Sequence, residues 1–377
     1  MKNRLIFFLF LMLTATLFST QTYEVSFEEL QLSGITYDNR LPMIYEPGNP
    51  CLPYQPITIL VPQNMQLSDL RISKHGEKIT PDTDLNYVRE QQTISFPKPD
   101  NTQKNSALYA LDEIYPKNDY KILDAQSMNG YQIVTVMLYP YRYNPAQKEL
   151  IVYNQFTVEP VYTRSAVELD TRMLSIDRKT QEKIGRLVIN PEVVAGYSRS
   201  IERVEATLPD PSEPYDMIII TGTDQLPWFT EYAQWKTNHG VLTNVVSVQD
   251  IYTEYAGVDH AEQLRYFIID AYQAYAGSSN PLKYILLGGD DEIIPIRGVY
   301  GIVGDTTDMN MPSDLYYACL DGSWDGNVNF IYGETDDNVD FYPEISVGRI
   351  PAESENEFNN FFNKAYHYVD DSSYSNN

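Results

Sequence analysis

The chain has 377 residues, of which 43% are hydrophobic and 21% are charged, a composition typical of a globular protein with two or more domains. It carries 52 acidic and 27 basic residues, for a net charge of −25. This balance argues against nucleic acid or anionic lipid as partners, because neutralising phosphate groups requires clustered Lys and Arg. The acidity favours solubility, and where carboxylates cluster with Gly and Asn it also favours a divalent cation.

The first 20 residues have the pattern of a secretory signal peptide. Lys2 and Arg4 form a basic start, and residues 5–18 are apolar apart from two Thr. This run is shorter than the roughly 20 residues of a membrane-spanning helix. We therefore predict that residues 1–20 direct export, that the mature chain has no membrane span, and that the protein is secreted or held at the cell surface. With only Cys51 and Cys319 present, disulfides do not hold the fold together.

Residues 21–164 have a β-rich pattern. Runs of β-branched and aromatic residues, separated by Pro, Asn, Asp and Gly, lie at 56–62, 131–138, 149–153 and 155–162. This spacing predicts a β-sandwich-like domain. Residues 165–213 are rich in charge and run into a proline-rich stretch. We interpret them as a linker with short helical pieces, where a maturation cleavage would fall.

From residue 214 the pattern changes to alternating strands and helices. Short apolar runs predict strands at 217–221, 241–246, 284–287 and 345–347. Apolar residues at helical spacing predict helices from Thr223 or Asp224 to Gly240, from Ala261 to Tyr275 and from 354 to 368. This order implies a doubly wound parallel α/β sheet with right-handed crossovers.

Two groups of carboxylates in this α/β part have the composition of a cation site. Asp290 follows the third strand, at a strand end where open α/β sheets gather functional groups. Between Asp321 and Glu344, acidic residues alternate with Gly and Asn, which suits calcium although the spacing is not that of an EF-hand. From the residues alone, a simple turn at Asp290 and a solvated acidic loop at 321–344 remain open alternatives.

A cysteine and several histidines raise the question of a catalytic dyad, in which the two groups must lie within hydrogen-bond reach. Cys319 is more typical of a small buried residue. His239 falls at a predicted helix end, where an exposed histidine is ordinary, and His260 precedes the next helix. We therefore assign no catalytic residue in this chain.

Several motifs, in their order along the chain, resemble the gingipain family of secreted cysteine endopeptidases. In the α/β part they are Trp235-Lys-x-x-x-Gly240, the segment Tyr284 to Pro295, Ser313-Asp-x-x-Tyr317, Asp340-x-Tyr342-x-Glu344, Val347-Gly-Arg-Ile350 and Tyr366-His-Tyr368. Upstream, the segments Glu46 to Pro53 and Ile59 to Pro62 are similar to the family's β-rich propeptide. The resemblance covers nearly the whole of the secreted part.

The resemblance implies a caspase-like fold for residues 214–377, a propeptide in residues 21–164, and a structural calcium ion. At the matching positions, the carboxylates of Asp290, Asp340 and Glu344 would bind the ion. Tyr342 and Asp321 would supply backbone oxygens.

The family's nucleophile follows an Ala-Cys-x-Asn-Gly sequence and its histidine lies in Gly-His-Gly, both in the second half of the catalytic unit. Ala318-Cys-Leu-Asp-Gly322 imitates the first, but it lies upstream of Gly348-Arg349, and no Gly-His-Gly occurs in the chain. The resemblance therefore implies a propeptide and a truncated first half of the catalytic unit, with the Cys/His dyad expected beyond residue 377.

The function expected from this resemblance is that of the N-terminal part of a secreted cysteine endopeptidase precursor, with proteins or peptides as substrates. A first alternative within the family is a sortase-like transpeptidase of the type IX secretion machinery, which adds that machinery as a partner. A second alternative is a non-catalytic surface protein stabilised by calcium.

Overall fold

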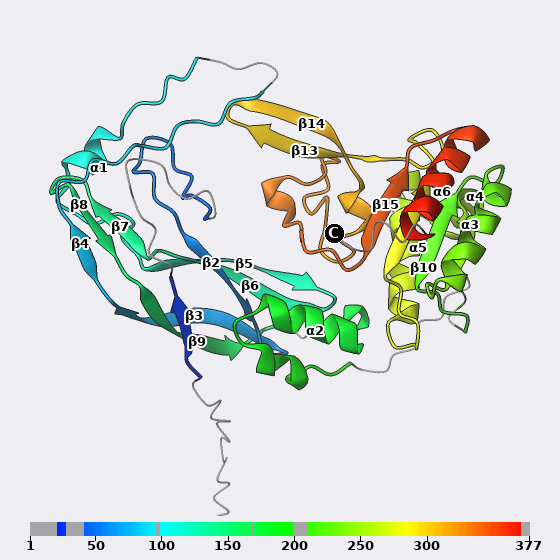
Figure 1. Cartoon of the computed structure of the whole chain (residues 1–377), viewed down its shortest axis with the longest axis horizontal. Coiled ribbons are helices and arrows are strands. Elements are labelled where there is room, and N and C mark those ends of the chain that lie inside the picture. The colour runs from blue at the N-terminus through cyan, green and yellow to red at the C-terminus, as the bar shows by residue number, and fades with distance from the viewer. Residues whose placement is uncertain are drawn as a thin grey trace, which may run out of the picture.

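The computed structural model describes residues 21–27, 41–94, 99–167, 169–199, 208, 210 and 212–370. The predicted signal peptide, residues 1–20, lies outside the described residues, as does most of the segment 200–211. A β-rich half is followed by an α/β half (Figure 1). Across the described ranges, no helix combines the length and apolar character needed to cross a bilayer.

The β-rich half contains three antiparallel sheets of three strands, with the orders β1-β9-β3, β2-β6-β5 and β4-β8-β7. The strands are β1 (Tyr23–Ser26), β2 (Gln55–Leu60), β3 (Met65–His75), β4 (Lys78–Thr80), β5 (Tyr120–Met128), β6 (Tyr131–Leu138), β7 (Tyr141–Asn144), β8 (Glu149–Val152) and β9 (Gln155–Arg164). A short helix, α1 (Ser106–Ala110), precedes β5. Each of the runs predicted as a strand forms one of these strands.

The first two of these sheets share one apolar core. Ile59 and Val136 enter it from the sheet of β2 and β6, and Leu70 and Val158 enter it from the sheet of β3 and β9. Because successive side chains of a strand point to opposite faces, each strand can contribute its alternate residues to this core.

The hairpin of β5 and β6 turns at Asn129-Gly130. Met128 pairs with Tyr131 across this two-residue loop, and the φ angles of Asn129 and Gly130 are 53° and 78°. Positive angles at both positions define a type I′ turn, for which Asn-Gly is the preferred sequence. A Cβ at Gly130 would lie 2.4 Å from the Cα of Leu174, so this turn leaves no room for a side chain.

The segment after β9 is folded onto the β-rich half. It contains η1 (Thr171–Met173), α2 (Arg178–Leu187) and η2 (Pro191–Gly196). Leu174 and Ile184 share a buried cluster with Leu60 of β2. The stretch from Leu174 to Tyr197, which lies inside the predicted linker over 165–213, therefore packs on the β-rich half, whereas Met173 is buried in the core of the α/β half. The physical reason is the apolar face of α2 and its flanks, which must be covered.

The α/β half is built on a four-stranded parallel sheet with the order β11-β10-β12-β15. Its elements are β10 (Met217–Thr221), α3 (Leu226–Asn238), β11 (Thr243–Ser247), α4 (Val248–Glu254), α5 (His260–Tyr275), β12 (Tyr284–Gly288), β15 (Ser346–Ile350) and α6 (Glu355–Asp370). The predicted parallel α/β sheet is confirmed, and α4 is an addition to the predicted helices.

Helices cover both faces of this sheet, which explains why β10 is an unbroken apolar run. Ile218 packs on one face with Phe267 of α5. Ile219 packs on the other face with Phe229 of α3 and Phe358 of α6. A strand that is buried on both faces has no position at which a polar side chain reaches water.

Between β12 and β15 the chain forms a hairpin that the sequence pattern did not predict. It consists of β13 (Arg297–Val303) and β14 (Thr306–Ser313), followed by η3 (Asp314–Tyr317) and η4 (Thr335–Asp337). The hairpin extends toward the β-rich half (Figure 1), and a Cβ at Gly304 would lie 2.8 Å from the carbonyl oxygen of Gln91. Most of β14 is exposed, so it lacks the apolar alternation from which strands are predicted.

Candidate functional site at the amino edge of the parallel sheet

The acidic segment that precedes β15 lies at the amino edge of the parallel sheet. Asp340 and Glu344 come just before Ser346, the first residue of β15. Ser346 pairs with Tyr284, the first residue of β12, so the amino ends of the two strands are side by side. The β5–β6 hairpin of the other half contacts Asp340 and Glu344 at this edge. Open α/β sheets carry their functional groups at the opposite, carboxyl edge.

The Glu344 carboxylate is held by backbone N–H groups from both halves. Its Oε1 accepts from the amide of Asn129 at 3.1 Å, and its Oε2 accepts from the amide of Leu320 at 2.8 Å. Asn129 also donates from Nδ2 to the carbonyl oxygen of Glu344 at 2.6 Å and to the Tyr272 hydroxyl at 3.0 Å. Asn129 and Glu344 are each only 5% exposed, so these hydrogen bonds are shielded from water.

The Asp340 carboxylate is held in the same way. Its Oδ2 accepts from the amide of Ser127 on the hairpin, and its Oδ1 accepts from the amide of Tyr342 at 2.9 Å. The Tyr342 hydroxyl lies 3.1 Å from Oγ1 of Thr135 on β6, which adds a contact between the halves. Both carboxylates are therefore engaged by N–H donors.

Asp321 lies beside these two carboxylates and next to a buried guanidinium. Nη2 of Arg265 donates to the main-chain carbonyl of Asp321 at 3.3 Å and to that of Cys319 at 2.8 Å, and Nε donates to that of Tyr316 at 3.1 Å. Arg265 thereby holds the backbone that leads into the acidic segment. Oδ1 of Asp321 is buried and lacks a hydrogen-bond partner among the described residues.

Burial raises the pKa values of all three carboxyl groups, and repulsion from a neighbouring carboxylate adds to it at Glu344 and Asp321. Burial, with a further contribution from the charge of Asp321, raises the pKa of Glu344 to about 9. Burial and the charge of Asp340 raise the pKa of Asp321 to about 7. Burial also raises the pKa of Asp340, against the hydrogen bonds from Ser127 and Tyr342. At neutral pH the group therefore carries fewer than three negative charges.

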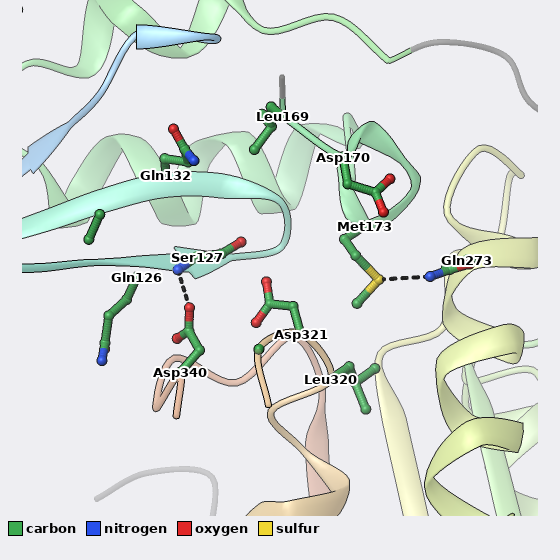
Figure 2. Close-up of a pocket in the computed structure, with 12 residues that line it drawn as sticks. Gln126, Ser127, Gln132, Leu169, Asp170, Met173, Gln273, Leu320, Asp321 and Asp340 are labelled. Carbon is green, nitrogen blue, oxygen red and sulfur yellow. Dashed lines mark hydrogen bonds between the residues drawn. The ribbon is translucent and has the colours of Figure 1, made fainter. Parts of the chain in front are cut away.

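A cavity of about 420 Å³ lies between the hairpin and the acidic segment (Figure 2). Its walls include Ser127 on the hairpin side, Met173 of η1, and Asp321 and Asp340 on the other side. Nε2 of Gln273 on α5 donates to the Met173 sulfur at 3.2 Å (Figure 2). The cavity is thus a feature of the junction between the halves and is formed by residues of both.

Asp290 lies far from the other predicted calcium ligands. It follows the carboxyl end of β12, whereas Asp340 and Glu344 precede the amino end of β15. Since β15 has 5 residues, the two edges are roughly 16 Å apart. The Asp290 carboxylate accepts from the amide of Glu292 at 3.1 Å, and its carbonyl accepts from Arg349 at 3.1 Å. Asp290 therefore does not lie with Asp340 and Glu344 in this structure, and a calcium ion shared by the three residues stays a prediction.

The remaining predicted ligands do not fit a calcium ion as they are arranged. Every carboxylate oxygen of Asp340 and Glu344 accepts an N–H hydrogen bond. Tyr342 turns its own N–H toward Asp340, and the Asp321 carbonyl accepts from Arg265. Calcium needs six to eight oxygens directed at the ion. In the described part of the chain, no group of three or more Asp, Glu, His or Cys could hold a metal ion. Calcium binding stays a prediction.

Cys319 occupies a core position. It is 0% exposed, and burial raises the pKa of its thiol, as does the charge of Glu344. The thiolate that nucleophilic attack requires is therefore disfavoured. His239 lies at the carboxyl end of α3 and His260 is the first residue of α5, as their sequence positions indicated. These features support the interpretation of Cys319 as a structural residue.

Asn129 was not predicted from the sequence as a functional residue. The signal was present, because Asn-Gly between two β-like runs predicts a two-residue hairpin. The pattern does not indicate which residue the turn contacts, because its partner Glu344 is 215 positions away. Arg265 was missed for a similar reason, because a buried arginine inside an amphipathic helix is known only from its contacts.

Comparisons with known proteins divide the chain near the boundary between its halves. Residues 17–184 match the model of the C25 propeptide, and residues 210–377 match the model of peptidase family C25. A propeptide followed by a peptidase domain is the organisation of a peptidase precursor. The propeptide match includes most of α2, in agreement with the packing of that helix on the β-rich half.

Curated relatives point to the same class. Gingipain R2 of Porphyromonas gingivalis is 24% identical over 260 residues, which are 69% of this chain and 30% of that protein. Lys-gingipain of the same species is 23% identical over 288 residues, which are 73% of this chain and 14% of that protein. The chain belongs to the gingipain family of cysteine peptidases and contains its propeptide and part of its peptidase domain. It spans less than a third of the length of these relatives.

Two solved structures show weaker overlap. The complex of RgpB pro- and mature domains from Porphyromonas gingivalis has a TM-score of 0.36 and 17% identity, over 45% of this chain and 91% of that one. Dimeric latent PorU from the same species has a TM-score of 0.33 and 12% identity, over 92% of this chain and 38% of that one. Scores of this size do not define a common fold.

Proposed function

We propose that this chain is the propeptide and the first half of a caspase-like catalytic unit in the precursor of an exported cysteine endopeptidase. The observation that supports the proposal most strongly is the order of the matched segments, a propeptide at 17–184 and a peptidase domain at 210–377. Export is proposed from the basic start and apolar run of residues 1–20. Proteins or peptides are the proposed substrates.

In the proposed reaction, a cysteine thiolate attacks the carbonyl carbon of the scissile peptide bond. A histidine moves the proton from the thiol to the leaving amine, and backbone N–H groups stabilise the oxyanion. The cysteine and histidine of this dyad are proposed to lie in a part of the peptidase domain outside these 377 residues.

The α/β half of this chain would stabilise the loops at the carboxyl edge of its parallel sheet. Nη1 of Arg349 donates to the carbonyls of Gly289 at 3.1 Å and Ile294 at 2.7 Å, which fixes the loop after β12. Nε and Nη2 of Arg349 donate to the carboxylate of Asp314 at 2.8 and 2.7 Å. Arg349 thus connects two loops at the edge where open α/β sheets place their functional groups.

The proposal is tested on protein isolated from its native source, with fluorogenic peptides and a thiol-alkylating reagent. We expect hydrolysis that alkylation abolishes and that the substitutions Cys51→Ser and Cys319→Ser leave unchanged. The 377-residue chain by itself is expected to hydrolyse no peptide. Hydrolysis by this chain that disappears in Cys319→Ser would overturn the assignment of the dyad. Transpeptidation, the alternative within the family, predicts an amide product when a primary amine is added to the assay.

A further inference from the structure

A cavity in the β-rich half lies apart from the junction between the two halves. It has a volume of about 410 Å³, and its lining includes Gln21 and Tyr23 at the start of the described chain, Tyr162 of β9 and Glu192 of η2. Every residue of the lining belongs to the β-rich half. We call it the N-terminal cavity, because the first described residues form part of its wall.

Strand pairing places the start of the chain beside this cavity. β1 is an edge strand that pairs antiparallel with β9, and the ladder ends at the pair of Tyr23 and Val158. Continued by two residues, the same register sets Gln21 opposite Pro160, which also lines the cavity. Pro160 has no N–H group to donate to a neighbouring strand. The residues before Tyr23 therefore leave the ladder at the cavity.

Glu192 is the carboxylate of the cavity that lacks a cationic partner. The other one, Glu159, pairs with Nη1 of Arg71 at 2.6 Å. Glu192 accepts a hydrogen bond from the Tyr23 hydroxyl, and among the described residues no Lys or Arg pairs with it. Burial and the charge of Glu192 raise the pKa values of Tyr23 and Tyr162, so both hydroxyls stay neutral. The cavity thus offers a set of acceptors that a positively charged group would complete.

The amino-terminal end of the secreted chain is the cation that the sequence supplies. Residues 1–20 have the pattern of a signal peptide, and their removal after Thr20 would convert the backbone nitrogen of Gln21 from a neutral amide into an α-ammonium group. That nitrogen belongs to a residue of the cavity wall. While residues 1–20 are attached the nitrogen carries no charge, so a charge pair at this position can form only after processing.

We infer that the N-terminal cavity is the binding site of the α-ammonium group of Gln21, with Glu192 as its counter-ion, and that this pair locks β1 onto β9 after export. The inference rests on the export proposed above and is independent of peptidase activity. β1 has only 4 residues and one neighbouring strand. Just beyond its carboxyl end, Phe27 packs edge-on against Phe156 with 5.0 Å between the ring centroids. The ion pair fastens the opposite end of the same strand.

The contribution of this pair to stability has a definite pH dependence. A free α-amino group has a pKa of about 7.7–8.0, and a nearby carboxylate raises that value in the folded state. The stabilisation is therefore complete below about pH 7.5 and is lost as the pH rises through the folded-state pKa. Besides Glu192, the charged and titratable groups of the wall are Arg71, Glu159, Tyr23 and Tyr162.

The experiment uses residues 21–377, released from a fusion partner by a protease that cuts directly before Gln21. The α-amine is labelled with an acylating reagent at pH 7, and the rate is followed by mass spectrometry of the N-terminal peptide. Only the neutral amine reacts, and Glu192 is exposed, so we expect labelling about twofold to fivefold slower than in Glu192→Gln. In a chain that begins at Thr20 the amine is displaced from the wall, and Glu192→Gln should leave its rate unchanged.

Glu182→Gln is the matched control. It changes the net charge by the same amount, but Glu182 pairs with Arg178 at 2.8 Å on the surface of α2 and is not part of the cavity wall. Labelling of Gln21 in this variant should proceed as in the unsubstituted chain. Thermal unfolding supplies a second measurement. The chain that begins at Gln21 should melt about 1–3 °C above the chain that begins at Thr20 at pH 6, and the difference should vanish at pH 10.

Equal labelling rates of Gln21 in the unsubstituted chain and in Glu192→Gln would overturn the inference, as would a difference in melting temperature that persists at pH 10. The intact mass of the exported protein tests the processing step. A first residue other than Gln21, or a Gln21 amine that has closed onto its own side-chain carbonyl with loss of ammonia, would also overturn it. Absence of peptidase activity in the native protein would overturn the proposed function and leave all of these results unaffected.

Discussion

Asn129 and Glu344 lie 215 positions apart in the sequence and are joined by two hydrogen bonds. The Asn129 amide donates to Oε1 of Glu344 at 3.1 Å, and Nδ2 of Asn129 donates to the Glu344 carbonyl at 2.6 Å. One residue belongs to a turn of the propeptide, and the other lies just before the edge strand of the α/β sheet. This pair of hydrogen bonds connects the two halves of the chain.

Gly130→Ala should strongly destabilise the chain. The glycine has a φ angle of 78°, and the new Cβ would lie 2.4 Å from the Cα of Leu174, a backbone atom that cannot move aside freely. We expect the free energy of unfolding to fall by about 2 kcal/mol or more in urea titrations. Gly196→Ala is the control, because a Cβ at Gly196 meets nothing within 4 Å and should change stability by less than about 0.5 kcal/mol. Equal effects of the two substitutions would contradict the close fit of the turn.

Cys319 should be the slower of the two thiols to react. It is fully buried and its pKa is raised by burial and by the charge of Glu344, whereas Cys51 is only partly buried. Iodoacetamide labelling of the native chain at neutral pH, followed by peptide mass mapping, should modify Cys51 first. Preferential labelling of Cys319 would indicate an activated thiol and contradict a structural role. Unfolding in denaturant should equalise the two rates.

The ion pair between Asp216 and Lys283 should make stability depend on pH in the acid range. Burial alone would raise the pKa of Asp216, but hydrogen bonds from Lys283 at 2.6 Å and Asn280 at 3.1 Å outweigh it, and the pKa is lowered. A lowered pKa in the folded state means that the stabilisation is present above about pH 4 and is lost as the pH falls through the folded-state value.

Asp216→Asn should therefore be less stable than the unsubstituted chain at pH 7, by about 1 kcal/mol or more, and the difference should shrink below pH 4. Thermal unfolding across this pH range measures it. Glu182→Gln is the control, because its pair with Arg178 is exposed on the surface of α2 and contributes little. A difference for Asp216→Asn that does not vary with pH would contradict the ion pair as its cause.

Calcium should not alter the melting temperature of the intact chain if the carboxylates of Asp340 and Glu344 are engaged by the β5–β6 turn. The measurement is differential scanning fluorimetry in millimolar calcium and in excess chelator. A rise of several degrees in calcium that is absent in Asp340→Ala would show that the ion stabilises the native state. That result would support the calcium site predicted from the sequence. Magnesium at the same concentration controls for ionic strength.

Much of the architecture was predictable because local patterns carry it. The unbroken apolar run at 217–221 indicates a strand covered on both faces, and β10 is such a strand. The sequence also indicated that Asp290 and Glu344 lie apart, because Asp290 follows one parallel strand and Glu344 precedes another. Residues that follow and precede parallel strands lie at opposite edges of a sheet. The grouping of Asp290 with Glu344 as calcium ligands came from the family resemblance and did not take these strand positions into account.

The sequence by itself determined the family of the chain and those strands and helices that have a clear apolar pattern, because periodicity acts over a few residues. Only the tertiary structure decided that the Asn129-Gly130 turn meets Glu344 and that Arg265 holds the carbonyls of Cys319 and Asp321. The donors and acceptors that match at this junction come from separate halves of the chain. No local pattern records such a match, since it exists only when both halves are folded and packed together.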